Sequence, residues 1–320
     1  EDQGLWRAAT TLTYANAASG LLAPLALLAL GRSAAGLRNP VSSVASWALL
    51  VGVGATLSRA GVLALTVGLV ALAVLLRPAG ALRVVLGPAA GALVAVAGLL
   101  PSVPAESSPR PLLAVVALLA GLAVVVGMAT VRVPRAVILL AVTLVVGAVG
   151  VAAVGTDAVG SIREKRLVLT SSDRARELIA ALDVARDHPV AGVGPGRAPL
   201  EWTGPDGRPL RARYAHNEYV QVLAELGVVG LGLLLVALSA AARVVVRSGQ
   251  AVRSRPIWMG ASAGLVALAV GSAFDFLWHV PAVPLVGALL FGLATPHHDC
   301  AAPAASPQPS KPIEKEQPCA

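Results

Sequence analysis

A cluster of polar side chains between residues 214 and 225 contains the groups best suited to acid–base chemistry. The cluster consists of Tyr214, His216, Asn217, Glu218, Tyr219, Gln221 and Glu225. His216 is its natural proton acceptor, because a neutral imidazole takes up a proton near pH 7. A single histidine before a helix is usually a cap or a surface residue. So many polar groups at the start of an apolar stretch instead favour a site at a membrane surface.

Residues 173–187 supply a candidate anion-binding cation. Their pattern predicts one short amphipathic helix, with Ser172 or Asp173 as its N-cap. One face of this helix holds Arg174, Leu178, Ala181, Leu182 and Ala185, and the opposite face holds Arg176, Asp183 and Asp187. An arginine centred on an apolar face needs an anionic partner, or it extends its head group to water. The sequence is compatible with both outcomes for Arg174.

Two further patterns carry possible chemistry. Gly192-Val-Gly194-Pro-Gly196 has glycines spaced as in a dinucleotide-binding loop, but that loop needs a strand before it and a helix after it. Because this string follows a predicted helix and contains proline, we interpret it as a tight turn, either plain or with N–H groups that meet an anion. Asp275 and His279 are four residues apart, so on a helix they would share a face and could pair, structurally or as part of a site.

The elements that must position these residues are membrane helices. Of the 320 residues, 56% are hydrophobic and 13% are charged, whereas soluble domains carry about 25% charged residues. This excludes a disordered chain and disfavours a soluble enzyme, and the 3% aromatic content disfavours base-stacking nucleic-acid modules. Nine apolar runs are candidate spans: Tyr14–Leu30, Val41–Leu57, Gly61–Leu76, Leu82–Leu100, Leu112–Val131, Ala136–Val154, Tyr219–Val246, Ile257–Phe274 and Pro281–Ala294.

The positive charges alternate between the connectors of these spans. The odd connectors hold Arg32, Arg38, Arg77, Arg83, Arg132, Arg135, Arg243, Arg247, Arg253 and Arg255, whereas the short even ones hold only Arg59 and Arg110. Lysine and arginine collect in cytoplasmic loops, so the odd connectors are predicted to be cytoplasmic. The N-terminus, Arg59, the long segment 156–216 and the 275–279 turn then share the external face. This distribution explains the net charge of +8 without nucleic acid.

The predicted architecture is an all-α, polytopic membrane protein with about nine transmembrane helices and one large external loop. Residues 1–155 hold spans one to six, 156–216 form the external loop with the amphipathic helix, 217–295 hold spans seven to nine, and 296–320 form a disordered cytoplasmic tail. Both cysteines, Cys300 and Cys319, lie in that tail, so neither a disulfide in the body of the chain nor a cysteine-based metal site is expected.

Several of these motifs, in this order, resemble the signature of the O-antigen ligase and polymerase superfamily. The resemblance rests on Asp187-His188-Pro189, Gly192-Val-Gly194-Pro-Gly196, His216-Asn217-Glu218-Tyr219 and Glu225-Leu-Gly227. Near the N-terminus, Tyr14-Ala-Asn16-Ala-Ala resembles the family's N-x-x-A helix. Leu57-Ser58-Arg59-Ala60-Gly61 resembles its S-R-G turn, with Ala60 as an extra residue. Family members are usually longer, with more N-terminal spans, and the chain begins at Glu1 without methionine, so we expect an N-terminally truncated member.

The resemblance implies a fold of the membrane glycosyltransferase type and an activity. Ligases of this kind move a glycan from undecaprenyl diphosphate to an acceptor hydroxyl on a lipid, glycan or protein at the external membrane face, without metal, nucleotide or other cofactor. One histidine and two arginines are essential, and they correspond here to His216, Arg59 and Arg174. The third match competes with Arg176, because the tryptophan that often follows the family's arginine is replaced by Leu178. Expected substrate-binding residues are Asn16, Gly194, Gly196, Asn217, Glu218, Tyr219, Asp275 and His279.

Two other functions remain open from the sequence. A polymerase of lipid-linked repeat units would use the same chemistry with a different acceptor. A transporter, such as one for bicarbonate, should show ionisable residues near mid-membrane or repeated halves with broken helices. The apolar runs instead carry charges only toward their ends, at Arg83, Glu225 and Arg243, and the polar clusters lie at one predicted face. This pattern favours chemistry on a lipid-borne substrate in the cell membrane over transport.

Overall fold

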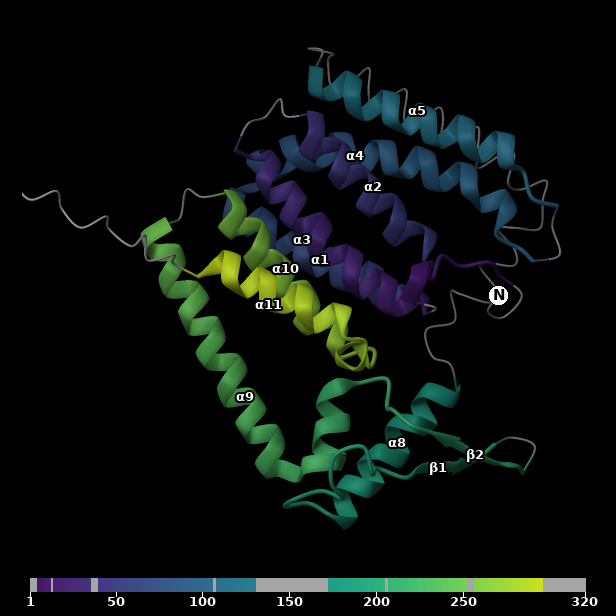
Figure 1. Ribbon diagram of the computed structural model, residues 1–320, viewed down its shortest axis with the longest axis vertical. Coiled ribbons are helices and arrows are strands. Elements are labelled where there is room, and N and C mark those ends of the chain that lie inside the picture. Colours follow the sequence, from purple (N-terminus) through teal and green to yellow (C-terminus); the bar gives the residue numbers. More distant parts are fainter. Residues whose placement is uncertain are drawn as a thin grey trace, which may run out of the picture.

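The computed structural model describes residues 5–12, 14–35, 40–105, 108–130, 172–204, 207–252 and 256–295 (Figure 1). Its α-helices are α1 (Ala15–Ser33), α2 (Pro40–Ala55), α3 (Arg59–Leu76), α4 (Pro78–Leu99), α5 (Pro111–Thr130), α8 (Ser172–Asp187), α9 (Glu218–Val252), α10 (Pro256–Ser272) and α11 (Ala282–Ala294). Eight of the nine predicted spans correspond to helices; the sixth, 136–154, and the tail 296–320 lie outside the described residues. The all-α, polytopic membrane fold is confirmed.

The spans are helical because leucine, valine and alanine dominate runs that are long enough to cross a bilayer. By length and composition α1, α3, α4, α5 and α9 can each cross, and α2, α10 and α11 are shorter apolar helices. Small residues allow close packing between them. A β-carbon on Gly31 of α1, for instance, would lie 2.4 Å from the backbone of Gly260 in α10. The helix bundle is therefore held by close backbone contact and apolar side chains.

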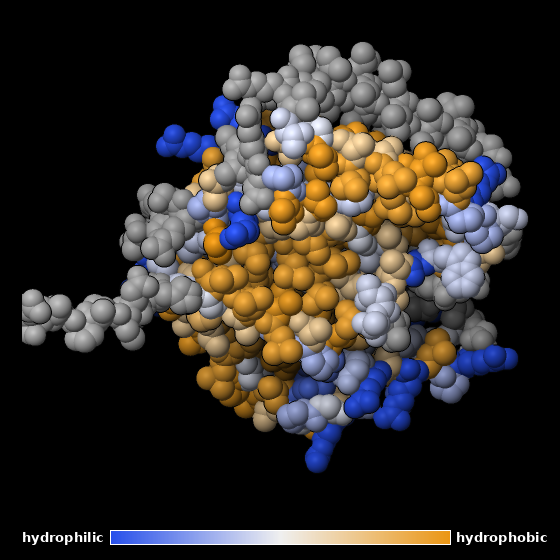
Figure 2. All heavy atoms as spheres, turned by 45° about the horizontal axis from the view of Figure 1, so that its top comes forward, coloured by the Kyte–Doolittle hydropathy of each residue, from blue (hydrophilic) through white to orange (hydrophobic). Residues whose placement is uncertain are grey.

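Helix α1 is the centre of this bundle. It packs against α2, α3, α10 and α11, while α4 and α5 form a pair on the outer side (Figure 1). Leu27 and Leu30 of α1, Leu72 of α3 and Ala263 of α10 meet in one fully buried cluster. Figure 2 shows a broad apolar surface over the helices, with hydrophilic side chains protruding mainly along its lower edge. An outward-facing apolar surface of this kind is suited to lipid.

A small polar domain, which we call the cap, lies at one end of the bundle. It consists of α8, the antiparallel hairpin of β1 (Leu200–Thr203) and β2 (Pro209–Ala212), and the first turns of α9 (Figure 1). Its core is a cluster of Ala181, Ala198, Leu200, Ala215 and Ala224. The hairpin was not anticipated, although the string Gly204-Pro-Asp-Gly207 between its strands has the composition of a turn.

Helix α8 agrees closely with the predicted amphipathic helix, but two assignments of its faces were wrong. Ala181 and Ala185 are buried as expected, whereas Leu182 is 41% exposed. Arg176 is half-buried, although the sequence placed it toward water. The reason is that the rest of the cap contacts α8 along an arc centred on Ala181. The buried face of α8 is therefore rotated toward residues 177 and 184.

The predicted seventh span is broken, which corrects its interpretation as one continuous helix. Gly227 has φ 64° and ψ −168°, so α9 consists of a short helix to residue 226 and a long one after it. The Gly192 turn docks at this break: the N–H of Gly194 donates to the carbonyl of Glu225 at 2.8 Å, and the N–H of Val228 donates to that of Pro189 at 2.8 Å. The polar residues 218–225 therefore belong to the cap rather than to the span.

Candidate functional site

The predicted site residues gather where the cap meets one end of the bundle. Helices α1 and α3 begin there, and α10 ends there. The first link is made by Arg7, whose guanidinium donates to the carbonyl of Thr56 and to Oδ1 of Asn16, each at 2.8 Å. The segment before α1, the start of α1 and the turn before α3 are thus joined. The charge alternation in the sequence predicted this shared end.

Asp275 is the hub of a hydrogen-bond network at this end. Its side chain is 1% exposed and lies in the turn after α10. The hydroxyl of Tyr14 donates to its carboxylate at 2.8 Å, and Nδ2 of Asn16 donates to Oδ2 at 2.6 Å. Burial, and next the nearby Asp275 charge, raise the pKa of Tyr14 above its usual range, so the phenol remains a donor. The predicted residues Asn16 and Asp275 therefore contact each other directly.

Arg174 reaches this network from the cap. Its Nη2 lies 3.8 Å from Oδ2 of Asp275, while its side chain remains 38% exposed. The apolar-face arginine has thus found the anionic partner that the helical pattern required. The assignment of Arg174, and not Arg176, as the functional arginine stays a prediction. The Arg174 side chain is partly exposed, and its planar guanidinium is of a kind that binds phosphate oxygens.

Arg59 is presented by the turn between α2 and α3. Leu57 has a positive φ of 50°, an uncommon conformation for a bulky residue, and Ser58 then caps α3 by accepting from the N–H of Gly61 at 3.1 Å. Arg59 is consequently the first residue of α3. Its side chain is half-buried, and the same turn packs on the start of α1, where a β-carbon on Gly61 would lie 2.4 Å from that of Ser19.

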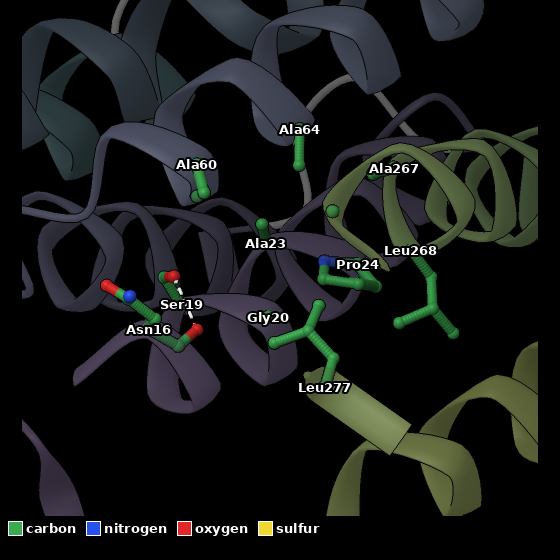
Figure 3. Close-up of a pocket in the computed structure, with 12 residues that line it drawn as sticks. Asn16, Ser19, Gly20, Ala23, Pro24, Ala60, Ala64, Ala267, Leu268 and Leu277 are labelled. Carbon is green, nitrogen blue, oxygen red and sulfur yellow. Dashed lines mark hydrogen bonds between the residues drawn. The ribbon is translucent and has the colours of Figure 1, made fainter. Parts of the chain in front are cut away.

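A small hollow connects this turn to the Asp275 network (Figure 3). It lies between α1, α3, α10 and the 3-10 turn Leu277–His279. Ala60 and Gly61 form part of one wall and Asn16 and Ser19 part of another, and the rest of the lining is small or apolar. The turn that carries Arg59 therefore lies directly across a narrow space from Asn16.

His216 is held from three directions. Its Nδ1 contacts the Glu177 carboxylate of α8. The ring of Phe276 lies edge-on, with centroids 5.3 Å apart. The preceding N–H, that of Ala215, donates to Oε1 of Gln221 at 2.7 Å, and Gln221 in turn donates to Glu225. The imidazole is fixed by both the cap and the turn after α10.

Asp275 and His279 do not pair, which corrects the helix-based expectation. The segment after α10 is a turn followed by a 3-10 helix, so the two residues do not share an α-helical face. Asp275 faces Tyr14 and Asn16, whereas Nδ1 of His279 lies 3.4 Å from Oε2 of Glu218. Glu218, 1% exposed, also accepts the N–H of Trp278. Its carboxylate thus anchors the turn to α9.

The remaining predicted substrate ligands have local partners. Asn217 caps α9 by accepting from the N–H groups of Tyr219 and Val220 at 3.0 and 3.1 Å. The hydroxyl of Tyr219 donates to the carbonyl of Ala269 at 2.9 Å. Gly194 and Gly196 lie in the turn docked at the α9 break, where the N–H of Gly194 is already bonded. Contact of these residues with substrate stays a prediction.

Four residues of the site were missed from the sequence: Arg7, Tyr14, Glu177 and Phe276. Glu177 had a recognisable signal, because it lies three residues after Arg174 and four before Ala181, within the same arc of the helix. For Tyr14 and Phe276 the available signal was the scarcity of aromatic residues in the chain. All three tyrosines of this aromatic-poor chain lie at the site, and the ring of Phe276 contacts two of them, Tyr14 at 5.0 Å and Tyr214 at 5.5 Å.

The Glu218–His279 pair predicts a pH-dependent stability. The hydrogen bond to Glu218 raises the pKa of His279 against the effect of burial, and Glu225 raises it further while Arg213 lowers it. A raised folded-state pKa stabilises the fold fully below about pH 6.5, and this contribution is lost as pH rises through the folded-state pKa. We expect thermal stability in lipid nanodiscs to fall as pH rises from about 6.5 through the folded-state pKa of His279. The loss should be at most about 1 kcal/mol, because the pair is partly exposed. An equal fall in His279→Gln would contradict this origin.

Within the described part of the chain, no group of three or more His, Cys, Asp or Glu side chains could hold a metal ion. The polar groups that do converge are a histidine–carboxylate pair, a buried carboxylate and two arginines. They can accept a proton and bind an anion beside the ends of apolar helices. This combination suits the transfer of a group from a lipid-linked anion.

Comparison with known proteins supports this interpretation of the site. Residues 102–235 match the family model described as O-antigen ligase. A comparison with curated proteins finds no match for the chain. The matched segment includes Arg174, Glu177 and His216, and the structure brings Asn16 and Asp275 to it from outside. The match covers less than half of the chain, and it supports membership in the O-antigen ligase superfamily of glycosyltransferase-like membrane proteins.

Proposed function

We propose that this protein transfers a glycan from undecaprenyl diphosphate to an acceptor hydroxyl at the outer face of the cytoplasmic membrane. The observation that carries the proposal is the juxtaposition of a proton acceptor, His216, with an anion-binding arginine, Arg174, at one end of a membrane helix bundle. The two are linked through α8: Arg174 contacts Asp275, and Glu177, one turn further, contacts His216. Both contacts lie at the junction of cap and bundle.

The chemistry needs one proton transfer and one displacement. The acceptor hydroxyl gives its proton to Nε2 of His216 while its oxygen attacks the anomeric carbon of the donor glycan. The bond between that carbon and the diphosphate oxygen breaks, and the leaving diphosphate keeps the electron pair. Direct attack inverts the anomeric centre. The proton on His216 then passes to solvent or to the departing phosphate, which restores the neutral imidazole.

Arg174 and Arg59 supply the positive charge that the leaving diphosphate requires. A planar guanidinium binds phosphate oxygens through paired N–H groups, and the stabilisation is greatest where charge develops in the transition state. Asp275 holds Arg174 in place from its buried side, so the exposed side faces the substrate. Asn217, Glu218 and Tyr219 are assigned to the rim of this site.

The distribution of basic residues supports an outward-facing site. Arg32 lies in the last turn of α1, at the end opposite to Tyr14, Arg77 is the C-cap of α3, and Arg243 and Arg247 lie in the C-terminal part of α9. All four are exposed. Because basic residues collect on the cytoplasmic side, the end with Asp275 and His216 is assigned to the outside.

A transfer assay with purified protein in nanodiscs tests the proposal. The donor is an undecaprenyl-diphosphate-linked glycan, the acceptor is a lipid, glycan or protein with a free hydroxyl, and products are identified by mass spectrometry. We expect glycosylated acceptor and free undecaprenyl diphosphate, with transfer that continues in EDTA. Arg174→Ala should lower the rate about 10²- to 10³-fold, because one charge-stabilising group is lost.

Arg186→Ala is the matched control. Arg186 lies on the same helix, is 80% exposed and pairs only at the surface with Asp183 at 3.2 Å, so its removal should leave the rate unchanged. Products that grow by repeated addition to a second lipid-linked glycan would identify a polymerase instead of a ligase. Unchanged transfer in Arg174→Ala would remove the proposed role of this arginine.

A further inference from the structure

We propose that Glu177 is a positioning residue that holds His216 in the tautomer and orientation of a general base. The inference rests on the proposed function. It concerns a residue that the sequence did not single out, on a helix 39 positions away from the histidine. The two residues form a histidine–glutamate dyad at the seam between α8 and the segment before α9.

The geometry of the pair defines the tautomer. The Glu177 carboxylate contacts Nδ1 of His216, and both side chains are largely buried, with exposed fractions of 11% and 22%. An ionised carboxylate only accepts hydrogen bonds, so Nδ1 must carry the hydrogen. The lone pair of the neutral ring then lies on Nε2, the atom assigned to the acceptor hydroxyl. Without the carboxylate, either nitrogen could carry the hydrogen.

The carboxylate also favours the protonated state that forms during the reaction. When Nε2 takes the acceptor's proton, the imidazolium that forms lies against the Glu177 carboxylate in a largely buried place. Other charged groups on the packed elements include Arg174 and Arg176 on α8, Arg213 before α9, Glu218 and Glu225 on α9, and Asp275 in the turn. Arg174 is directed to Asp275 and Glu218 to His279, so Glu177 is the carboxylate assigned to His216.

The contacts around His216 suit a fixed orientation. Phe276 packs edge-on against the ring at 5.3 Å, and the N–H of Ala215 is bonded to Gln221. Three elements therefore hold His216: α8 contacts Nδ1, the turn after α10 contacts one side of the ring, and α9 binds the preceding backbone N–H. Nε2 is the ring atom left for a reactant. A purely structural link between α8 and α9 would need only the contact, whereas a base also needs the charge and the tautomer.

Glu177→Gln separates these two roles, because the amide keeps the shape of the side chain and removes its charge. We expect transfer to fall at least about 10²-fold, since loss of an orienting carboxylate in a Ser-His-Asp site costs about 10⁴-fold. The His216 ring should lose its preference for the Nδ1–H tautomer, because the amide of glutamine can either donate or accept a hydrogen bond. Glu177→Asp should recover part of the rate.

Asp183→Asn is the control, because Asp183 lies on the same helix, is exposed and pairs with Arg186. It should leave both the rate and the His216 tautomer unchanged. Thermal unfolding and ¹⁵N spectra of the His216 ring report the fold and the tautomer independently of activity. A wild-type rate and an unchanged Nδ1–H tautomer in Glu177→Gln would overturn the inference, while Arg174→Ala still tests the function. Loss of the folded cap in Glu177→Gln would assign the residue a structural role and overturn it as well.

Discussion

His216→Ala is expected to lower glycan transfer by about 10²- to 10⁴-fold, the usual contribution of a general base. The reason is that the acceptor hydroxyl would have no group to take its proton as its oxygen attacks. The fold should survive, because the side chain is 22% exposed and the Ala215–Gln221 contact uses the backbone. The measurement is the initial rate of transfer in nanodiscs at saturating donor, together with thermal unfolding of the same samples.

His188→Ala provides the comparison for this variant. His188 ends α8 in the same cap but is exposed, and it is not assigned to the reaction. Its replacement should leave the transfer rate at the wild-type level. If both histidine variants retain wild-type transfer, the base is another group and the proposed mechanism is wrong. If both lose transfer with a lowered unfolding temperature, the cap has been destabilised, and His216→Gln then gives the decisive rate.

Gly192→Ala is expected to separate the cap from the break in α9. Gly192 has φ +65°, and a β-carbon there would lie 2.2 Å from the backbone carbon of Glu225. The left-handed backbone costs about 1–2 kcal/mol for a non-glycine residue, and the collision adds about 1–3 kcal/mol because backbone atoms cannot move aside. We expect lower thermal stability, faster hydrogen exchange in residues 190–228, and lower transfer, because the Gln221–Glu225 contact that supports His216 is attached to this seam.

Gly196→Ala isolates the effect of the collision. Gly196 lies in the same turn with φ +68°, but a β-carbon there would meet nothing within 4 Å. It should show only the cost of the left-handed backbone and leave the exchange of the α9 break near wild type. Equal losses in both variants would show that backbone conformation alone matters. The docked seam would then not hold the cap.

Much of the fold could be predicted because membrane spans leave a local signal. Runs such as Leu112–Val131 are apolar over about 20 residues, and a bilayer leaves the helix as almost the only way to satisfy their backbone. The site could be located as well, because alternation of arginines between connectors predicts which ends of the helices lie together. That is why Asn16, Arg59, His216 and the 275–279 turn were expected on one face before any contact was known.

Other features were beyond local patterns. The break at Gly227 depends on docking against the Gly192 turn, so the sequence of α9 by itself was interpreted as a continuous span. The pairing of Asp275 with His279 followed from helical spacing, but the chain turns after α10, and each side chain finds its partner on a different element. Spacing predicts contacts only within an element that stays regular.

The sequence by itself determined the membrane helices, the end of the bundle that carries the site, and the candidates His216 and Arg174. Only the tertiary structure decided their partners: Glu177 for His216, and Asp275, held by Tyr14 from 261 positions away, for Arg174. The physical reason is that hydropathy and charge act on each segment separately through the bilayer. A hydrogen bond between buried groups depends instead on which segments pack together, and that is set by the whole chain.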